Sequence, residues 1–306
     1  MSNDKIVENK VVLVTGAGGG IGREIALLMA ANGAKVVVND LGTSVNGQGK
    51  NASVAQKVAD EIKAGGGNAV ASTDSVAEWE GAQRIIKTAI DAFGRVDCVV
   101  NNAAILRDGI FHKLTQEDWD LSINVILNGS FYVSRAAATH FRSQGGGNFV
   151  HISSNSGIVG ALGQANYSAA KMGLVGLSKS IAVDMKRFGV RSNIVAPTAF
   201  TRMAEAIPTN TDEQKERMRN REPVPPSKNA PLVVYLASDA AKEISGQIFY
   251  VRKNELVLFS QMRPLQRIHC SDGWTPQSIA EHMRPAFEKS FYPLDLNRDV
   301  FTTWLP

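Results

Sequence analysis

The sequence predicts an α/β protein built on one doubly wound parallel sheet. Short apolar runs rich in β-branched residues alternate with helical patterns along residues 1–251, and this alternation is typical of a parallel sheet covered by helices. The run Val11–Val14 leads directly into a glycine-rich turn and a helical pattern. No Pro/Ser-rich linker and no internal repeat divides this region. We therefore expect a single domain over residues 1–251 and a C-terminal extension over residues 252–306.

Several short segments have the character of buried strands, since each is apolar and bounded by turn residues. They are residues 11–15, 35–39, 68–72, 96–101, 148–153, 190–195 and 247–251. In the extension, Leu256–Phe259 predicts one more strand. Residues 275–289 predict a helix, because Thr275 is a good cap and Pro276 suits the first helical position.

The first turn carries a dense glycine pattern, in the run Thr15-Gly16-Ala17-Gly18-Gly19-Gly20-Ile21-Gly22. A strand, a glycine loop and a helix in this order are typical of a dinucleotide-binding Rossmann fold. Its glycines let backbone N–H groups approach a pyrophosphate, and the helix N-terminus faces the phosphate charge. The spacing is G-x-x-x-G-x-G rather than G-x-G-x-x-G, and a glycine-rich turn can also be purely structural.

Asp40 ends the second expected strand, 24 positions after Gly16. This is near the roughly 20 positions at which an acidic residue binds the adenosine ribose in dinucleotide folds. A carboxylate there accepts hydrogen bonds from the ribose hydroxyls and repels a 2′-phosphate. Because no Arg or Lys occupies 17–19 or 41–43, the pattern favours NAD over NADP. The alternative is that Asp40 is a turn residue without a ligand.

Tyr167 and Lys171 are four positions apart within a helical pattern, so their side chains share one helix face. A phenol loses its proton near pH ~10, and a nearby ammonium group lowers that pKa. The pair predicts a general acid/base that works near neutral pH. Ser154 follows the strand at 148–153, at the edge of a parallel sheet where ligands bind. Its hydroxyl could hydrogen-bond a substrate carbonyl.

The order and spacing of these motifs resemble the short-chain dehydrogenase/reductase family over about residues 8–251. The motifs are T-G-x-x-x-G-I-G, Asn101–Ala104, Ser154, Tyr167-x-x-x-Lys171 and Asn193–Pro197. Within that family the chain resembles the (3R)-hydroxyacyl-CoA dehydrogenase part of peroxisomal type 2 multifunctional enzyme and its bacterial single-domain relatives. The similar stretches are Val36–Gly42, Asn101–Asp108, Gly163–Lys171 and Thr201–Met203, and the long loop Gly42–Lys50 is also similar.

The resemblance implies a role for each matching residue. Tyr167 exchanges a proton with the substrate oxygen, Lys171 lowers the pKa of Tyr167 and holds the nicotinamide ribose, and Ser154 orients the carbonyl. The implied NAD-binding residues are Gly16, Gly20, Ile21, Gly22, Asp40, Leu41, Asp74, Ser75, Asn102, Ala103, Ala104, Tyr167, Lys171, Pro197 and Thr201.

The chain departs from the family pattern at Ile126, where the family often has Asn and the hydroxyacyl-CoA subgroup typically has His. Asn124 and Asn128 are each about 200° away around an α-helix, so neither replaces it without a shift of register. A proton relay here would need a backbone carbonyl and water. Ala104 and Thr198 replace usual glycines, which predicts mild crowding near the cofactor.

Composition excludes several other classes. The chain is 44% hydrophobic and 20% charged, as in soluble globular proteins, and its net charge of +4 does not suggest nucleic-acid binding. Its 2 cysteines and 5 histidines show no metal-ligand spacing, so we expect no metal. No stretch reaches the ~18 apolar residues of a membrane span, and a reducing cytoplasm is the expected setting.

The sequence therefore predicts an NAD-dependent oxidoreductase that acts on a secondary alcohol or ketone, with a 3-hydroxyacyl-CoA in lipid or steroid degradation as the implied substrate. One alternative is a 3-oxoacyl-acyl-carrier-protein reductase, although Asp40 disfavours its usual NADPH. Another is a non-catalytic dinucleotide-binding protein.

The basic stretch Thr211–Lys228 resembles the mobile substrate lid of the family, or is a solvated helix. The resemblance also implies a homodimer or homotetramer. We expect the aromatic tail to pack on the body, a partner subunit or the substrate cleft.

Overall fold

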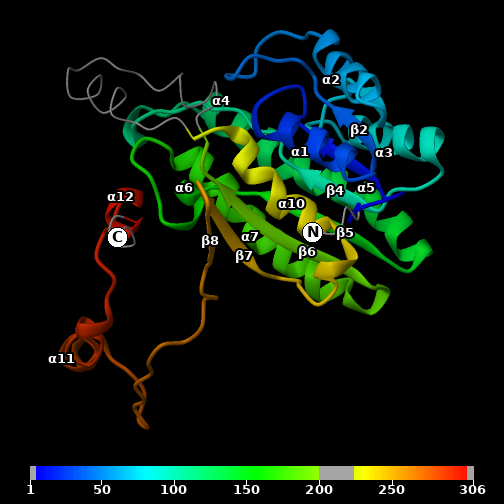
Figure 1. The fold of residues 1–306 in the computed structure, drawn as a ribbon. Coiled ribbons are helices and arrows are strands. Elements are labelled where there is room, and N and C mark those ends of the chain that lie inside the picture. Colours follow the sequence, from blue (N-terminus) through cyan, green and yellow to red (C-terminus); the bar gives the residue numbers. More distant parts are fainter. Residues whose placement is uncertain (1–4, 200–223, 302–306) are drawn as a thin grey trace. The chain divides into compact units, whose positions relative to one another are not determined.

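The computed structural model describes residues 5–199 and 224–301. It contains two compact units, residues 1–259 and 260–306. The first unit is built on an eight-stranded sheet in the order β3-β2-β1-β4-β5-β6-β7-β8 (Figure 1). Its strands are β1 Val11–Thr15, β2 Lys35–Asn39, β3 Asn68–Ser72, β4 Cys98–Asn101, β5 Gly147–Ile152, β6 Val190–Pro197, β7 Ile248–Arg252 and β8 Glu255–Leu258.

Neighbouring strands are parallel except for β7 and β8, which pair antiparallel. Each predicted strand overlaps an observed one, and the predicted doubly wound sheet is confirmed. The strand predicted at 256–259 corresponds to β8, which completes this sheet as its edge strand. The boundary expected at 251/252 thus falls inside the first unit, between β7 and β8.

Helices connect the parallel strands, as such crossovers require. In the first unit they are α1 Gly20–Ala31, α2 Ser53–Ala64, α3 Trp79–Phe93, α4 Gln116–Ser122, α5 Gly129–Gln144, α6 Asn155–Ile158, α7 Ala165–Asp184 and α10 Ala230–Ala237. Single short turns are η1 Phe111–Lys113, η3 Lys186–Phe188, η4 Pro226–Asn229 and η5 Asp239–Ala241, and η2 Ile123–Asn128 is a π-helix between α4 and α5.

The strand pattern explains the layers. All five residues of β1 are buried, because alternate side chains pack on opposite faces. Val12 and Val14 belong to a core with α1, α2 and α10, whereas Val11 and Leu13 belong to a core with α3 and α5. Figure 1 shows α1 and α10 lying together over one face. Each fully buried aliphatic side chain of this kind contributes about 1.5–3 kcal/mol.

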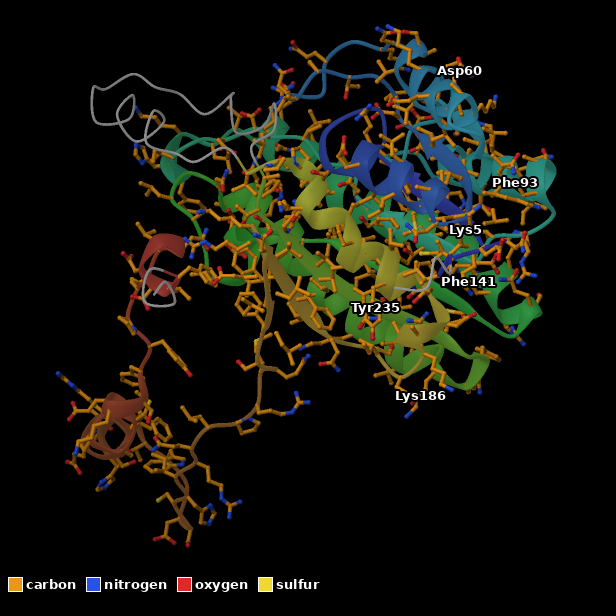
Figure 2. All side chains as sticks on the ribbon, in the orientation of Figure 1. Lys5, Asp60, Phe93, Phe141, Lys186 and Tyr235 are labelled. Carbon is orange, nitrogen blue, oxygen red and sulfur yellow. The ribbon has the colours of Figure 1, made fainter. Side chains whose placement is uncertain are left out.

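The second core includes Phe141 on α5, which is labelled in Figure 2 and packs on Phe149 of β5 with ring centroids 4.8 Å apart. A side chain at Gly147 would place its Cβ 2.1 Å from the Phe141 ring. The strand therefore begins at a residue that must be glycine, which accounts for one member of the Gly145–Gly147 run.

The topology places the ends of several strands at one crevice. The chain passes from β1 to β2 and β3 on one side, and then returns to β4 on the other side of β1. The carboxyl ends of β1 and β4 therefore flank the point where the strand order reverses, which is where ligands bind in open α/β sheets.

The second unit contains α11 Pro276–Phe287, η6 Glu288–Ser290 and α12 Asn297–Phe301. Thr275 caps α11, since its Oγ1 accepts a hydrogen bond from the Ser278 N–H at 3.1 Å, and Pro276 occupies the first helical position. The expectation that the aromatic side chains of this unit pack on the body, a partner subunit or the substrate cleft stays a prediction. Within the described residues, no helix combines the length and apolar character needed to cross a bilayer.

Candidate active site

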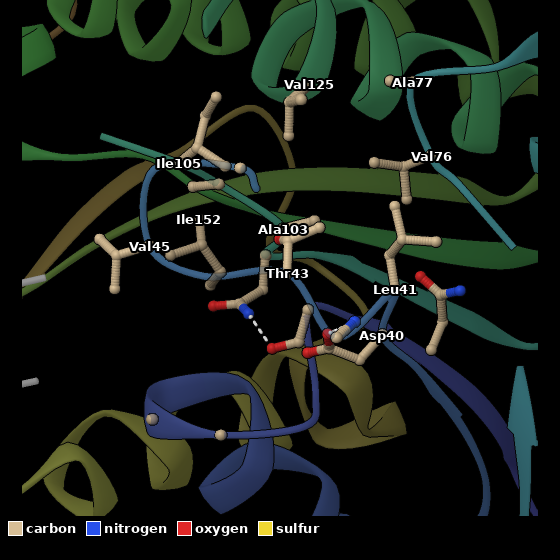
Figure 3. A pocket seen from close by; sticks show the side chains of 18 of the residues that line it. Asp40, Leu41, Thr43, Val45, Val76, Ala77, Ala103, Ile105, Val125 and Ile152 are labelled. Atoms are coloured by element: carbon tan, nitrogen blue, oxygen red, sulfur yellow. Dashed lines mark hydrogen bonds between the residues drawn. The ribbon is translucent and has the colours of Figure 1, made fainter. Parts of the chain in front are cut away.

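A cavity of about 510 Å³ lies at the carboxyl ends of the strands. Figure 3 shows Val45 and Ile105 on one side of it and Leu41 and Val76 on the other. The structure brings these predicted residues together around it: Gly16, Gly20, Ile21, Asp40, Leu41, Asp74, Ser75, Asn102, Ala103, Ala104, Tyr167, Lys171 and Pro197. Gly22 does not line the cavity, and Thr201 lies outside the described residues.

The loop after β1 is held against the loop after β4. Thr15 Oγ1 accepts hydrogen bonds from the backbone N–H groups of Asn102 at 3.0 Å and Ala103 at 3.1 Å. The Asn102 side chain donates to the carbonyls of Thr15 and Gly16, each at 3.0 Å. Gly16 has φ +62°, and a Cβ there would lie 2.8 Å from Ala103 Cα. Asn102 thus holds the glycine loop with its side chain and is also one of the residues that line the cavity.

The N-terminus of α1 faces this cavity through Gly19 and Gly20. The cap residue Gly19 offers no side-chain cap, and the first turn contains no acidic residue. Unpaired N–H groups at such a terminus form an anion site. A Cβ at Gly22 would lie 2.3 Å from the Gly16 carbonyl oxygen. Gly22 therefore permits close packing of helix on loop, which explains why it does not line the cavity.

Asp40 is fixed by two backbone groups. Its Oδ2 accepts a hydrogen bond from the Gly18 N–H at 2.8 Å, and its Oδ1 accepts one from the Gly42 N–H at 2.7 Å. An ionised carboxylate has about four acceptor positions, so acceptor capacity remains for a ligand in the cavity. Among the described residues that line this cavity, Lys171 is the single cationic side chain.

Tyr167 and Lys171 both project from the first turns of α7 toward the cavity. Lys171 is 2% exposed, and its Nζ donates to the Ile152 carbonyl at 2.6 Å. The same Nζ lies 5.5 Å from the centroid of the Tyr167 ring. Ser154 does not line the cavity; it caps α6 by accepting a hydrogen bond from the Ser156 N–H at 3.2 Å. Its hydroxyl lowers the pKa of Tyr167.

Burial displaces the pKa values of this pair in opposite directions. Loss of hydration raises the pKa of Tyr167 to about 12, and the hydrogen bond with Ser154 opposes that rise. Loss of hydration also lowers the pKa of Lys171 to about 7. The sequence argument expects the pKa of Tyr167 to move toward neutral. In this structure burial is the largest cause and raises that pKa instead, and the ammonium group of Lys171 is itself disfavoured by desolvation.

Ile126 does not face the cavity. Its side chain is 0% exposed and packs in a core with Ala170, Leu174 and Ile194. Its carbonyl accepts a hydrogen bond from Ser130 Oγ at 2.6 Å, so one acceptor position of the proposed relay carbonyl is already used. The preceding residue, Val125, lines the cavity instead. The π-helix over 123–128 explains the difference, because the sequence argument assumed α-helical spacing.

Thr198 also differs from the expectation. Its Oγ1 donates to the Tyr250 hydroxyl at 2.9 Å, and its carbonyl accepts a hydrogen bond from Asn229 Nδ2 at 3.0 Å. The side chain is therefore held against β7 rather than placed as a crowding group beside the cofactor. Ala104 does line the cavity, as expected.

The sequence reasoning missed the loop after β2 as a wall of the cavity. Thr43, Ser44, Val45 and Gly47 line it. The loop is joined to the segment after β4, because Val45 O accepts from the Leu106 N–H at 3.0 Å and Asn46 O accepts from Arg107 Nε at 2.8 Å. The length of this loop was its one signal in the sequence.

Two reactive side chains elsewhere in the first unit take no part in this geometry. Cys98 is fully buried, and loss of hydration raises its pKa to about 12. His112 lies in the exposed turn η1. No group of residues within 5–199 and 224–301 could hold a metal ion. Arg202, Met203 and most of the basic stretch 211–228 lie outside the described residues.

Comparisons with known proteins agree with this geometry. Residues 10–212 match the family described as short chain dehydrogenase. A crystal structure of a short chain dehydrogenase from Mycobacterium avium superposes with a TM-score of 0.82 at 38% identity, and the match covers 95% of this chain and 99% of that one.

Curated relatives give the same result. The chain is 36% identical to the hydroxyacyl-CoA dehydrogenase ChsB1 of Mycobacterium tuberculosis, over 97% of this chain and 96% of that protein. It is 46% identical to the peroxisomal multifunctional enzyme type 2 of Mus musculus, over 78% of this chain but 31% of that longer protein.

The fold and these matches define an oxidoreductase that acts on CH–OH groups of small molecules with a nicotinamide dinucleotide. The chain belongs to the short chain dehydrogenase family.

Proposed function

We propose that the chain is an NAD-dependent dehydrogenase of 3-hydroxyacyl-CoA thioesters. The observation that carries the proposal is the position of Tyr167, with Lys171 and Ser154 around it, beside a cavity that also contains Asp40. One end of this cavity is suited to a dinucleotide, and the other end presents a proton donor. The nicotinamide supplies hydride chemistry when it is bound.

We assign the catalytic steps to Ser154, Tyr167 and Lys171. Tyr167 gives its hydroxyl proton to the carbonyl oxygen during reduction and takes the alcohol proton during oxidation. Because burial raises its pKa to about 12, this arrangement favours the protonated form that reduction uses. Oxidation needs the phenolate, which the Lys171 ammonium stabilises. Ser154 donates a hydrogen bond to the substrate oxygen and holds it beside Tyr167.

Asp40 supports NAD as the cofactor. Its carboxylate is fixed by Gly18 and Gly42, so it cannot easily turn away from a 2′-phosphate. The same argument disfavours the alternative of an NADPH-dependent 3-oxoacyl-acyl-carrier-protein reductase. The intact set of Ser154, Tyr167 and Lys171 disfavours a non-catalytic dinucleotide-binding protein.

The substrate class is supported by the names of relatives. ChsB1 is named a hydroxyacyl-CoA dehydrogenase. BbsD of Thauera aromatica, 34% identical over 80% of this chain, is named a subunit of a dehydrogenase that acts on a hydroxy(phenyl)methylsuccinyl-CoA. Both printed substrates are CoA thioesters with a secondary hydroxyl group, and we assign the same chemistry to this chain.

Two further properties belong to this proposal. We propose a homodimer or homotetramer, as the family resemblance implies, and a reducing cytoplasm as the compartment. Both described cysteines, Cys98 and Cys270, are free thiols, which agrees with a reducing setting.

Turnover assays test the function. Purified protein is assayed with 3-hydroxyacyl-CoA thioesters of increasing chain length, each with NAD and with NADP. We expect oxidation of at least one thioester, with a higher kcat/KM for NAD. Absence of turnover on every thioester, together with tight NAD binding, would support the non-catalytic alternative. A preference for NADPH in the reverse reaction on an acyl-carrier-protein substrate would support the reductase.

A further inference from the structure

The loop over residues 42–50, between β2 and α2, is joined to a segment on the other side of β1. The Leu106 N–H donates to Val45 O at 3.0 Å, and Arg107 Nε donates to Asn46 O at 2.8 Å, both from the segment after β4. In the sheet, β1 lies between β2 and β4. The loop and this segment together therefore span the carboxyl end of β1, where the glycine loop starts.

The cavity is bounded by this loop and by the N-terminus of α1. Residues 43–45 and Gly47 of the loop line it (Figure 3), and so do Gly19 and Gly20 at the start of α1. That helix terminus suits the pyrophosphate of a dinucleotide, and the pyrophosphate is the middle of such a ligand. A dinucleotide bound in this cavity is therefore enclosed at its middle between α1 and the loop.

The base of the loop is fixed. The Asn51 N–H donates to Leu41 O at 3.3 Å, and a Cβ at Gly42 would lie 2.1 Å from Asn51 O. The Gly42 N–H also donates to Asp40 Oδ1 at 2.7 Å. The two ends of the loop thus lie close together, as in an Ω-loop.

The tip of the loop is a compact turn with few attachments. The Ser44 N–H donates to Gln48 O at 2.8 Å and the Gly47 N–H to Ser44 O at 2.9 Å, whereas Gly49 has φ +78° and open space around it. None of residues 41–50 is buried. Within the part of the chain that the structure describes, the hydrogen bonds from this turn to other segments are the two from the segment after β4. Segments with few buried contacts open at a small cost in free energy, so the turn can move while the base stays in place.

Arg107 is the side chain that holds the tip. Its guanidinium donates to Asn46 O and also pairs with Asp118 of α4 at 3.2 Å. The carbonyl of Arg107 accepts a hydrogen bond from Asn166 Nδ2 of α7 at 2.9 Å. Because Arg107 is anchored to both helices, opening of the loop breaks the contact with Asn46 and leaves Arg107 in place.

We propose that residues 43–49 form a strap that must open for a nicotinamide dinucleotide to enter or leave, and that Arg107 holds this strap closed. The class of ligand follows from the family, so the inference depends neither on the choice between NAD and NADP nor on the substrate. Entry and exit both require the contacts from Leu106 and Arg107 to break. Such a conformational step limits the release of bound molecules in many enzymes.

A strap and an ordinary binding contact have different kinetic signatures. If the dinucleotide enters and leaves only through the open form, both its rate constants are scaled by the fraction of protein that is open. Weakening the strap then raises the association and dissociation rate constants by a similar factor and leaves Kd nearly unchanged. Loss of a direct binding contact instead raises the dissociation rate constant and Kd together.

The first experiment removes the contact at the tip. Arg107→Met keeps an unbranched side chain without a donor. Association and dissociation of NADH and of NADPH are followed by stopped-flow fluorescence. We expect both rate constants to rise by about threefold to tenfold, as the loss of one hydrogen bond implies, with Kd nearly unchanged. Arg95→Met is the matched control, since Arg95 is ion-paired with Asp97 at 2.6 Å and does not line the cavity, and it should change neither rate constant.

A second experiment holds the strap closed. Asn46→Cys and Asp108→Cys, in a Cys270→Ser background, place thiols at two exposed positions, on the loop and on the segment after β4. Cys98 is fully buried. A bismaleimide with a flexible spacer joins the two thiols, and mass spectrometry verifies the cross-link. We expect the cross-linked protein to lose NADH association on the stopped-flow timescale, and protein loaded beforehand to retain its NADH. The same variant before cross-linking is the control.

The outcomes are distinct. A similar rise of both rate constants in Arg107→Met, with loss of association after cross-linking, supports the strap. A rise in the dissociation rate constant and Kd alone would overturn it, because the loop would then be a binding contact. Association at the rate of the control with the cross-link in place would also overturn it, as would a wild-type protein that binds neither dinucleotide. Absence of turnover on every 3-hydroxyacyl-CoA refutes the proposed function instead, because the strap is tested by binding.

Discussion

The side chain of Asn166 holds the backbone of Tyr167, since Asn166 Oδ1 accepts a hydrogen bond from the Tyr167 N–H at 2.8 Å. Its Nδ2 donates to the carbonyls of Arg107 at 2.9 Å and Asp118 at 3.0 Å, and to Ser122 Oγ at 2.9 Å. One buried amide thus joins the first turn of α7 to α4 and to the segment after β4. The position of the tyrosine is set by tertiary contacts as well as by its helix.

The first prediction follows from this amide. Asn166→Ala leaves several buried polar groups without their partner, and we expect the free energy of unfolding to fall by about 1–3 kcal/mol. Turnover should fall further than stability explains, because the first turn of α7 loses its attachment. Urea unfolding and kcat are measured on the same preparation. Asn128→Ala serves as the control, since its amide makes one longer contact, to Asn124 at 3.3 Å.

The second prediction concerns proton transfer. Tyr167→Phe removes the transferable proton and should lower kcat by at least ~10²-fold, while the Kd for NAD changes little. Lys171→Ala should weaken both turnover and NAD binding, because Lys171 lines the cavity as well as facing the phenol. Steady-state kinetics and isothermal titration separate the two effects. Near-normal turnover by Tyr167→Phe would contradict the assignment of Tyr167 as the residue that transfers the proton.

The third prediction concerns cofactor choice. Asp40→Ser should narrow the difference in Kd between NADH and NADPH, because the 2′-phosphate no longer meets a carboxylate. Asp40→Asn keeps one acceptor oxygen, enough for either the Gly18 or the Gly42 N–H group but not for both, and it should also narrow this difference. Fluorescence titration gives both constants. Tighter binding of NADPH than of NADH by the wild type would contradict this assignment of Asp40.

The fourth prediction concerns Ile126. Ile126→Val should cost about 0.5–1.5 kcal/mol of stability, with an unchanged pH–rate profile. Ile126→Asn places an amide in a core where the side chain is 0% exposed, so it should cost clearly more, about 2–5 kcal/mol. Thermal or urea unfolding checks the order. An Asn variant as stable as the Val variant, with activity gained, would show that the position can turn to the cavity.

The fifth prediction concerns pH and Lys171. Its folded pKa of about 7 lies below the ~10.4 of an unfolded lysine, so the unfolded chain binds a proton that the folded chain has lost. The free energy of unfolding of the cofactor-free protein should therefore rise with pH from about 7 toward 10, by at most ~1.4 kcal/mol per pH unit. Lys171→Met should reduce this slope. Urea unfolding at pH 6, 7.5 and 9 tests the difference, and parallel profiles for the two proteins would contradict it.

Much of the fold could be predicted from the sequence because its signals are local. The buried strand Val11–Val14, the glycine loop and Asp40 follow from hydrophobic pattern and turn chemistry. The π-helix around Ile126 could not be predicted, because one extra residue in a helical turn leaves no mark in composition. The side chain of Thr198 was misplaced for a related reason, since its partner Tyr250 is distant in sequence.

In the candidate site, too, local sequence signals could be predicted and contacts between distant segments could not. Residue types and spacing indicated Tyr167 and Lys171, whereas the balance of burial against charge depends on the surrounding atoms. The role of Asn166 could not be predicted, because a single asparagine forms no sequence pattern. Its function depends on the hydrogen-bond acceptors that other segments bring to it.

The hydrogen bonds of Arg107 connect the first turn of α7, at one end of the cavity, to the loop after β2, which forms a wall of the cavity. Asn166 holds the carbonyl of Arg107, and the guanidinium of Arg107 holds Asn46, in the loop that walls the cavity. A ligand that pushes this loop outward therefore also strains the attachment of the first turn of α7. Binding of a ligand at one end of the cavity should therefore change the affinity for a ligand at the other end, and this coupling is reciprocal. Cofactor and substrate should consequently bind as dependent events, with each changing the affinity of the other by the same factor.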